Sequence, residues 1–275
     1  MTPTTPRPAK RKGRPKGFNQ AGQTTIQSLD RALDVLDTLA AAGGITLTEL
    51  STRLGQSPAT MYRVLGTLQA RQVVEIDAPT QGWHIGPAAF RLGSAFLRRS
   101  GVVEKSRPVM RELMQATGET ANLGIARDGE VMFISQVETQ ASIRAFFPPG
   151  TLTPMHSSGI GKALLGCLDA PALDKFLRTH RLERFTDRTF TDPAGLRAEL
   201  AATAARGWSF DNEEKTPGMR CVAAPVFNAH GEAVAGISVS GPTGRMPDDR
   251  IEAIAALVME AAATVSGGLG APPGA

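Results

Sequence analysis

Residues 46–71 carry the pattern of two short helices joined by a tight turn, and no other stretch of the chain limits the possible folds as strongly. In the first half, leucines at three- and four-residue steps share one helical face: Leu47, Leu50 and Leu54. Thr46 and Glu49 have the spacing of a capping box at the start of this helix. Gly55 can adopt the positive φ that ends the helix, and Ser57 supplies the N-cap of the next one.

The second helix of this stretch is predicted to have one apolar face and an exposed N-terminal end. Its apolar positions keep helical spacing: Met61, Val64, Leu65 and Leu68. The candidates for contact with DNA lie near its N-terminus: Ser57, Ala59, Thr60, Tyr62 and Arg63. A helix that reads the major groove needs this arrangement, because its first turns contact base edges and phosphates while its other side packs on the scaffold. An αα-hairpin inside a larger helical domain has the same spacing, so this pattern alone leaves both interpretations open.

Positive charge is concentrated at the N-terminus of the chain. The 275 residues carry a net charge of +4, yet residues 1–20 contain six basic side chains and no acidic one: Arg7, Lys10, Arg11, Lys12, Arg14 and Lys16. Such a basic arm indicates a polyanionic partner, most often nucleic acid. Residues 13–15, Gly-Arg-Pro, resemble the core of an AT-hook, which predicts that Arg11, Arg14 and Lys16 lie in an A·T-rich minor groove. The alternative is a solvated basic tail with only nonspecific attraction to phosphates.

Cysteine content and hydropathy predict the cellular compartment of the protein. The two cysteines, Cys167 and Cys221, have neither CxxC spacing nor neighbouring histidines, which argues against disulfides and a structural metal and favours a reducing cytosol. No apolar run approaches the roughly 18 residues that a membrane span needs. We therefore expect a soluble cytoplasmic protein that carries no cofactor or metal and has no contact with a membrane.

The N-terminal part is predicted to be a flexible basic arm followed by a winged helix-turn-helix domain. Residues 1–22 have a composition that cannot form a core, and residues 23–86 contain a bracing helix, the helix-turn-helix and a short two-stranded wing. Residues 87–102 then form a linker helix, in which apolar and basic residues alternate. This helix either docks on the second domain or pairs with its counterpart in a dimer, and the sequence leaves both possibilities open.

The C-terminal part, residues 103–267, is predicted to be an α+β domain with a central antiparallel sheet. Apolar runs at 122–127, 130–137 and 142–147 are expected to be strands, and Asp128-Gly129 is a strong hairpin signal. The runs CVAAPVFN and AVAGISVS flank a second turn as another hairpin, and helices are expected before and after the strands. Residues 268–275, rich in glycine and proline, are expected to be a disordered tail.

Several long motifs identify the chain as resembling the IclR family of bacterial transcriptional regulators. They are SLDRALDVLDTLA, GWHIGPAAFRLG, LTPMHSSGIGKALL, GWSFDNEEKTPGMRCVAAPVFN and ISVSGP. The resemblance implies a winged helix-turn-helix joined to a GAF-like effector domain, assembly as a dimer or tetramer on a pseudo-palindromic DNA operator, and control by a small organic acid. Within the family, the GRP arm, the GWHIG wing and the pattern MHxSGxGKALL are most similar to glyoxylate-responsive regulators of allantoin and glyoxylate metabolism.

The candidate effector site combines this resemblance with local chemistry. Residues 158–161 precede an apolar helix and are small enough for an anion to approach backbone N–H groups, whereas Lys162 is either a counter-ion or a solvated first-turn residue. The phosphate-loop spacing GxxxxGK[ST] is absent. By resemblance, the ligand-contacting residues are Gly159, Ile160, Asp211, Cys221, Ser238 and Ser240. Ser238 and Ser240 are two apart on a predicted strand and so face the same side. Ile160 stands where the related pattern usually carries Ala, which would narrow the pocket.

Two functions other than ligand-responsive DNA binding are alternatives for this chain. Cys221, Asp211 and the histidines suggest thiol catalysis, but no histidine lies near Cys221 in sequence, and an enzyme would have no use for the DNA-binding features. The second alternative is a metabolite-binding module whose helix-turn-helix serves protein interaction. Without the resemblance, the structural interpretation of each residue ranks ahead of a functional one: an inert buried thiol for Cys221, a turn-capping carboxylate for Asp211 and a structural hydrogen bond for His156.

Overall fold

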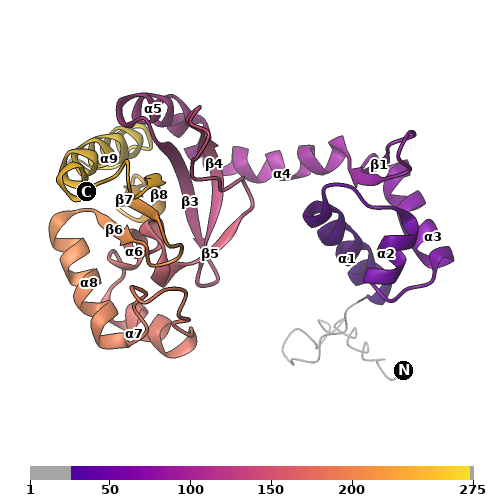
Figure 1. The fold of residues 1–275 in the computed structure, drawn as a ribbon, viewed down its shortest axis with the longest axis horizontal. Helices are drawn as coiled ribbons and strands as arrows, with labels where there is room; N and C mark the ends of the chain where they lie inside the picture. The colour runs from indigo at the N-terminus through magenta and orange to yellow at the C-terminus, as the bar shows by residue number, and fades with distance from the viewer. Residues whose placement is uncertain (1–25, 273–275) are drawn as a thin grey trace, which may run out of the picture. The chain divides into compact units, whose positions relative to one another are not determined.

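The computed structural model describes residues 26–272, which form two compact units divided between Leu92 and Gly93. The first unit contains α1 (Gln27–Ala42), α2 (Leu47–Arg53), α3 (Pro58–Ala70), β1 (Val74–Ile76) and β2 (Trp83–Ile85) (Figure 1). The division falls inside α4 (Pro87–Ser100), which is one continuous helix.

The first unit is a winged helix-turn-helix, as the sequence predicts. The capping box is present, since Glu49 N donates to Thr46 Oγ1 at 3.3 Å and Thr46 N donates to Glu49 Oε2 at 3.0 Å. Gly55 has a φ of +59° in the turn, and Ser57 Oγ accepts from Thr60 N at 3.2 Å as the N-cap of α3. β1 and β2 pair antiparallel as the wing. One core joins all these elements through buried side chains: Val35, Leu39, Ile45, Leu50, Met61, Leu65, Val74 and Trp83.

The second unit is built on a six-stranded antiparallel sheet in the order β5-β4-β3-β8-β7-β6. Its strands are β3 (Thr120–Arg127), β4 (Glu130–Val137), β5 (Leu152–Pro154), β6 (Ser209–Asn212), β7 (Met219–Phe227) and β8 (Ala233–Pro242). Its helices are α5 (Val102–Thr117), the 3₁₀ turn η1 (Met155–Ser157), α6 (Gly159–Leu165), α7 (Ala170–Thr179), α8 (Pro193–Arg206) and α9 (Asp248–Gly268). The predicted α+β class with a central antiparallel sheet is therefore confirmed.

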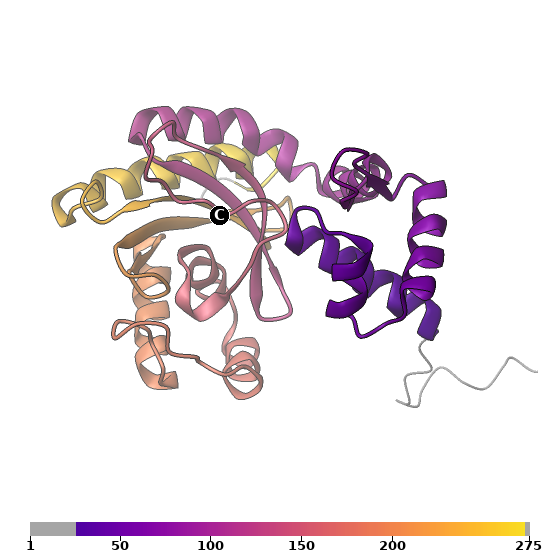
Figure 2. The ribbon, with the colours of Figure 1, turned by 45° about the vertical axis from the view of Figure 1, so that its right-hand side comes forward.

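Helices cover both faces of this sheet. Figure 2 shows α5 and the yellow α9 side by side on one face, where they enclose the larger core with Met110, Val239 and Val258. The pink and orange helices α6 to α8 cover the opposite face around a smaller core that includes Ile160, Phe176 and Leu196. The second core holds α6 against β7 and β8, which positions the N-terminus of α6 over the sheet.

The predicted strand at residues 142–147 is wrong. These residues form an irregular loop, and the strand that pairs with the side of β4 opposite β3 is β5, where Val131 lies opposite Thr153. Arg144 pairs instead with Glu138 at 2.7 Å, and Ala145 O accepts from Thr120 Oγ1 at 3.1 Å. Two consecutive prolines follow the loop and have no N–H to donate to a ladder, so pairing resumes only beyond them. The four-residue β6 was not anticipated from the sequence.

α9 is long and apolar enough to cross a membrane by length and composition. In the fold it is the helix that closes the larger core, because one face buries Ile251, Ile254, Val258 and Val265 against the sheet and α5. Glu252 and Glu260 interrupt the apolar sequence of this helix, so it contains no uninterrupted apolar run of that length. The helix continues to Gly268.

Candidate functional site

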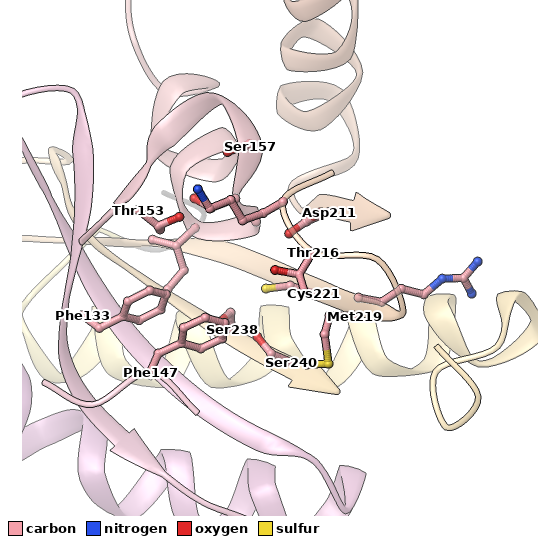
Figure 3. Close-up of a pocket in the computed structure, with 15 residues that line it drawn as sticks. Phe133, Phe147, Thr153, Ser157, Asp211, Thr216, Met219, Cys221, Ser238 and Ser240 are labelled. Carbon is pink, nitrogen blue, oxygen red and sulfur yellow. The ribbon is translucent and has the colours of Figure 1, made fainter. Parts of the chain in front are cut away.

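A small cavity lies between α6 and the sheet of the second unit (Figure 3). All six predicted effector residues line it: Gly159, Ile160, Asp211, Cys221, Ser238 and Ser240. They come from α6, β6, β7 and β8, so the sheet order brings together positions that are up to about 80 residues apart in sequence. The cavity has a volume of about 40 Å³. On the same volume scale, one enclosed water molecule needs roughly 10–15 Å³. This space suits a ligand of only a few heavy atoms.

The two serines on β8 are held in place by an amide on the neighbouring strand. Asn122 on β3 lies opposite Ser238, and its Nδ2 donates to Ser240 Oγ at 3.2 Å and to Ser238 Oγ at 3.5 Å. Gln136 Nε2 in turn donates to Asn122 Oδ1 at 2.9 Å, which fixes the orientation of the amide. Because both serine oxygens accept from Asn122, their hydroxyl hydrogens point elsewhere, and each can donate to the Cys221 sulfur or to a group in the cavity.

Asp211 brings a buried carboxyl to the cavity. It lies opposite Cys221 across the β6–β7 pairing, is 9% exposed, and accepts a hydrogen bond from Glu214 N at 2.8 Å through Oδ1. Burial raises the pKa of Asp211 to about 6, although the Lys162 ammonium opposes this shift. The carboxyl thus fills the turn-capping role considered for it and faces the cavity as well.

Cys221 is a neutral thiol that packs tightly on the start of α6. Burial, followed by the charge of Asp211, raises its pKa to about 11, so the thiolate needed for nucleophilic catalysis is scarce at neutral pH. A Cβ added to Gly159 would lie 2.7 Å from Cys221 Sγ, so only glycine fits this close approach. The contact lets the backbone at the start of α6 come close to the sheet.

Two further glycines explain how the bulky Ile160 is accommodated. Gly124 on β3 and Gly236 on β8 are paired, and a Cβ added to Gly236 would lie 2.7 Å from Ile160 Cγ2. The side chain of Ile160 is 1% exposed and rests in the space that these glycines leave free. Part of the volume that isoleucine adds relative to alanine is therefore taken up at the sheet.

Lys162 has neither of the two roles considered from the sequence. It is fully buried and its ammonium donates to a carboxylate oxygen of Glu214 and, at 2.5 Å, to Phe210 O. Glu199 Oε1 lies 3.4 Å from the same nitrogen and also accepts from Arg206 Nη2 at 2.8 Å. The cluster of Lys162, Glu199, Arg206 and Glu214 lies beside the cavity, and none of the four lines it. Lys162 is thus a structural charge, and burial raises the pKa of Glu214 to about 7.

Sequence reasoning missed several residues that line the cavity. Phe133 and Phe147 stack with ring centroids 4.8 Å apart and form an apolar wall. The remaining lining residues are Thr153, Ser157, Ser158, Lys215, Thr216, Met219 and Arg220. Phe147, Ser157, Lys215 and Thr216 lie in loops or turns, where no periodicity marks which side chains turn inward. Within residues 26–272, no group of three or more His, Cys, Asp or Glu side chains that could hold a metal ion is present.

His156 has the structural role that the sequence left open. Its Nε2 lies 2.9 Å from Glu183 O, and its ring stacks on Phe185 with centroids 6.1 Å apart. Burial lowers the pKa of His156, so the ring is neutral at physiological pH.

The N-terminal end of α3 presents the predicted DNA contacts at the surface. Ala59, Tyr62 and Arg63 are exposed, and Tyr62 keeps 64% of its surface although it is a large aromatic residue. The hydroxyl of Ser57 is exposed but engaged in capping, and Thr60 Oγ1 lies 2.9 Å from it. The predicted minor-groove contacts Arg11, Arg14 and Lys16 lie outside the described residues.

Comparison with known proteins covers both units. The chain matches the IclR helix-turn-helix domain over residues 28–78 and the C-terminal domain of the bacterial transcriptional regulator IclR over residues 94–267. The HTH-type transcriptional regulator BhcR of Paracoccus denitrificans is 57% identical over 258 residues, which cover 94% of this chain and 92% of BhcR. The transcriptional repressor IclR of Escherichia coli is 38% identical, with 95% and 96% covered. The crystal structure of Thermotoga maritima IclR has a TM-score of 0.79 and 28% identity, and the match covers 89% of this chain and 99% of that one.

These matches agree with the winged helix-turn-helix of the first unit and with the cavity-bearing sheet of the second. The chain belongs to the IclR family and is a ligand-responsive bacterial transcriptional regulator, not an enzyme.

Proposed function

We propose that the effector is a short 2-oxo acid, with glyoxylate as the best candidate. The observation that carries this proposal is the pair of Ser238 and Ser240 hydroxyls, whose oxygens accept from Asn122 and whose hydrogens can turn from the weakly accepting Cys221 sulfur to an anion in a cavity of about 40 Å³. Hydroxyl donors and a small volume together favour a compact anion over the drug-sized ligands that fill typical pockets.

The carboxylate of the acid binds the two serine hydroxyls and the backbone N–H groups at the start of α6. Ser158 caps this helix by accepting from Gly161 N at 3.1 Å, and the first N–H groups of any helix lack intrahelical acceptors. Asp211 accepts a hydrogen bond from the hydrated aldehyde of glyoxylate at the other end of the ligand. The stacked rings of Phe133 and Phe147 keep bulk water away from one side.

The DNA-binding end acts through α3. A dimer, or a tetramer made of two dimers, presents two such helices to the half-sites of a pseudo-palindromic operator in the cytoplasm, with Tyr62 and Arg63 among the contacts. Ser57, Ala59 and Thr60 accompany them along the first turn, and Arg11, Arg14 and Lys16 enter flanking minor grooves. The effector shifts the balance only if it binds one arrangement of the DNA-binding units better than the other, and α4 is the element that connects the two units.

Calorimetry with glyoxylate on the full chain tests the effector site. We expect heat of binding from the wild type, and none from Ser240→Ala or Asp211→Ala at concentrations that saturate the wild type. Cys167→Ala is the matched control, because Cys167 lies outside the cavity. Normal glyoxylate binding in both pocket variants would overturn the assignment.

Salt dependence of operator binding tests the basic arm. Removal of residues 1–20 should weaken binding and flatten the slope of log affinity against log salt, since fewer counterions are released. An unchanged slope would show that the arm does not contact DNA.

A further inference from the structure

One hydroxyl at the cavity has no partner in the described part of the chain. Ser157 is fully buried in η1 and lines the cavity, and its Oγ makes no hydrogen bond to any of residues 26–272. Buried polar groups are nearly always paired, because an unpaired one forfeits the hydrogen bonds that water would give it. The Ser157 hydroxyl is therefore able to form a hydrogen bond with a molecule that enters the cavity.

The neighbouring Ser158, unlike Ser157, already has a hydrogen-bond partner. Ser158 is also buried, but its Oγ accepts from Gly161 N at 3.1 Å and is engaged in capping α6. The family pattern MHxSGxGKALL fixes the position of Ser158 and leaves that of Ser157 open. Residue 157 can therefore differ between proteins with different ligands without loss of the cap at the start of α6.

Ser157 also lies on a different side of the cavity from the serine pair. In Figure 3, Ser157 and Thr153 lie on one side of the cavity, and Ser238 and Ser240 lie on the other. A small acid anchored by the pair directs its remaining oxygen atoms away from β8. A serine hydroxyl can donate to such an oxygen, or accept from it when it carries a hydrogen.

We propose that the hydroxyl of Ser157 is a further effector-binding group, which hydrogen-bonds an oxygen of a short 2-oxo or 2-hydroxy acid and contributes to its selection. This inference rests on the effector site proposed above. It adds a contact that the family pattern does not include. A buried hydroxyl without a hydrogen-bond partner costs free energy, and the bound acid supplies that partner to Ser157.

The test combines two measurements on the full chain, the unfolding temperature without ligand and the affinity for glyoxylate. In Ser157→Ala, the unfolding temperature without ligand should stay the same or rise, because an unpaired buried hydroxyl is removed. The affinity for glyoxylate measured by calorimetry should fall about tenfold, the usual effect of losing one hydrogen bond to a charged or strongly polar ligand. A folding defect would instead lower the unfolding temperature.

Ser106→Ala is the matched control. Ser106 is likewise fully buried in α5 and its Oγ likewise lacks a partner among the described residues, but it does not line the cavity. We expect Ser106→Ala to bind glyoxylate as the wild type does. Equal weakening in both variants would assign the effect to packing and overturn the proposal.

Wild-type affinity in Ser157→Ala would also overturn it, because the hydroxyl would then serve only a bound water. Failure of the acid site itself looks different. In that case neither the wild type nor the Ser106→Ala control would bind glyoxylate, glycolate, pyruvate or oxalate, and both the proposed site and the role of Ser157 would be rejected.

Discussion

The affinity for glyoxylate should fall as the pH rises from 6 to 8, because the anion enters beside the buried carboxyl of Asp211. Burial already raises the pKa of Asp211 to about 6, and a second negative charge in the same cavity raises it further. Binding therefore takes up a proton at Asp211 when the pH lies above 6. A protonated carboxyl can still accept a hydrogen bond through its carbonyl oxygen.

The magnitude follows from the protonated fraction of Asp211 in the empty protein. With a pKa of about 6, this fraction is about one half at pH 6 and about one hundredth at pH 8. If the acid binds only the protonated form, its dissociation constant rises about 50-fold over this range, and by nearly tenfold per pH unit above pH 7.

The charged groups around Asp211 define the controls. Lys162 lies beside Asp211, Lys215 lines the cavity, Glu213 is half-buried, and Cys221, with a pKa of about 11, keeps its proton throughout. Glu214 has a pKa of about 7 and titrates in the same range, but it does not line the cavity. Glu214→Gln should therefore retain the pH dependence, whereas Asp211→Asn, which resembles the protonated side chain, should bind with an affinity that is nearly independent of pH.

Calorimetry in two buffers of different ionisation enthalpy measures the proton directly. At pH 7.5 the wild type should take up close to one proton per glyoxylate bound, and Asp211→Asn close to none. A flat pH profile in the wild type, or an unchanged slope in Asp211→Asn, would refute the linkage.

Three further results are expected. Lys162→Met should lower the free energy of unfolding by about 3–5 kcal/mol in denaturant titration, since it leaves a buried carboxylate unpaired. Adding Glu214→Gln to that variant should recover most of the loss, and equal instability of single and double variants would argue against the ion pair. Asn122→Ala should weaken glyoxylate binding about tenfold by releasing the serine hydroxyls, and unchanged affinity would show that Asn122 has no orienting role. Arg63→Ala should impair operator binding in an anisotropy assay while the calorimetric heat with glyoxylate stays normal, and loss of both would indicate misfolding.

Local signals predicted much of the fold because they act over a few residues. The capping box of Thr46 and Glu49, the N-cap Ser57 and the hairpin at Asp128-Gly129 all depend on neighbours in sequence, and all are present. Alternation on a strand likewise brought Ser238 and Ser240 to one face. The pairing of β4 with the edge strand β5 is not a local property of the sequence. It depends on which segment comes to lie beside β4 after the loop at 142–147.

The fine structure of the site depends on contacts between distant segments. The oxygens of Ser238 and Ser240 are held by Asn122, more than 100 residues away, and no pattern near either serine reveals it. Lys162 looked like a first-turn residue because its partners Glu199 and Glu214 belong to later elements. The motifs thus identified six of the residues that surround the cavity, and only the packed sheet shows the remaining lining residues and the hydrogen bonds among them.

The central claim, that a small acid bound in this cavity controls DNA binding, is tested by titrating glyoxylate into the full chain bound to labelled DNA from the region upstream of its own gene. We predict a change in operator affinity of about fivefold or more, in either direction, in the wild type and none in Ser240→Ala. Glyoxylate that binds the wild type with normal heat yet leaves its operator affinity unchanged would contradict the claim.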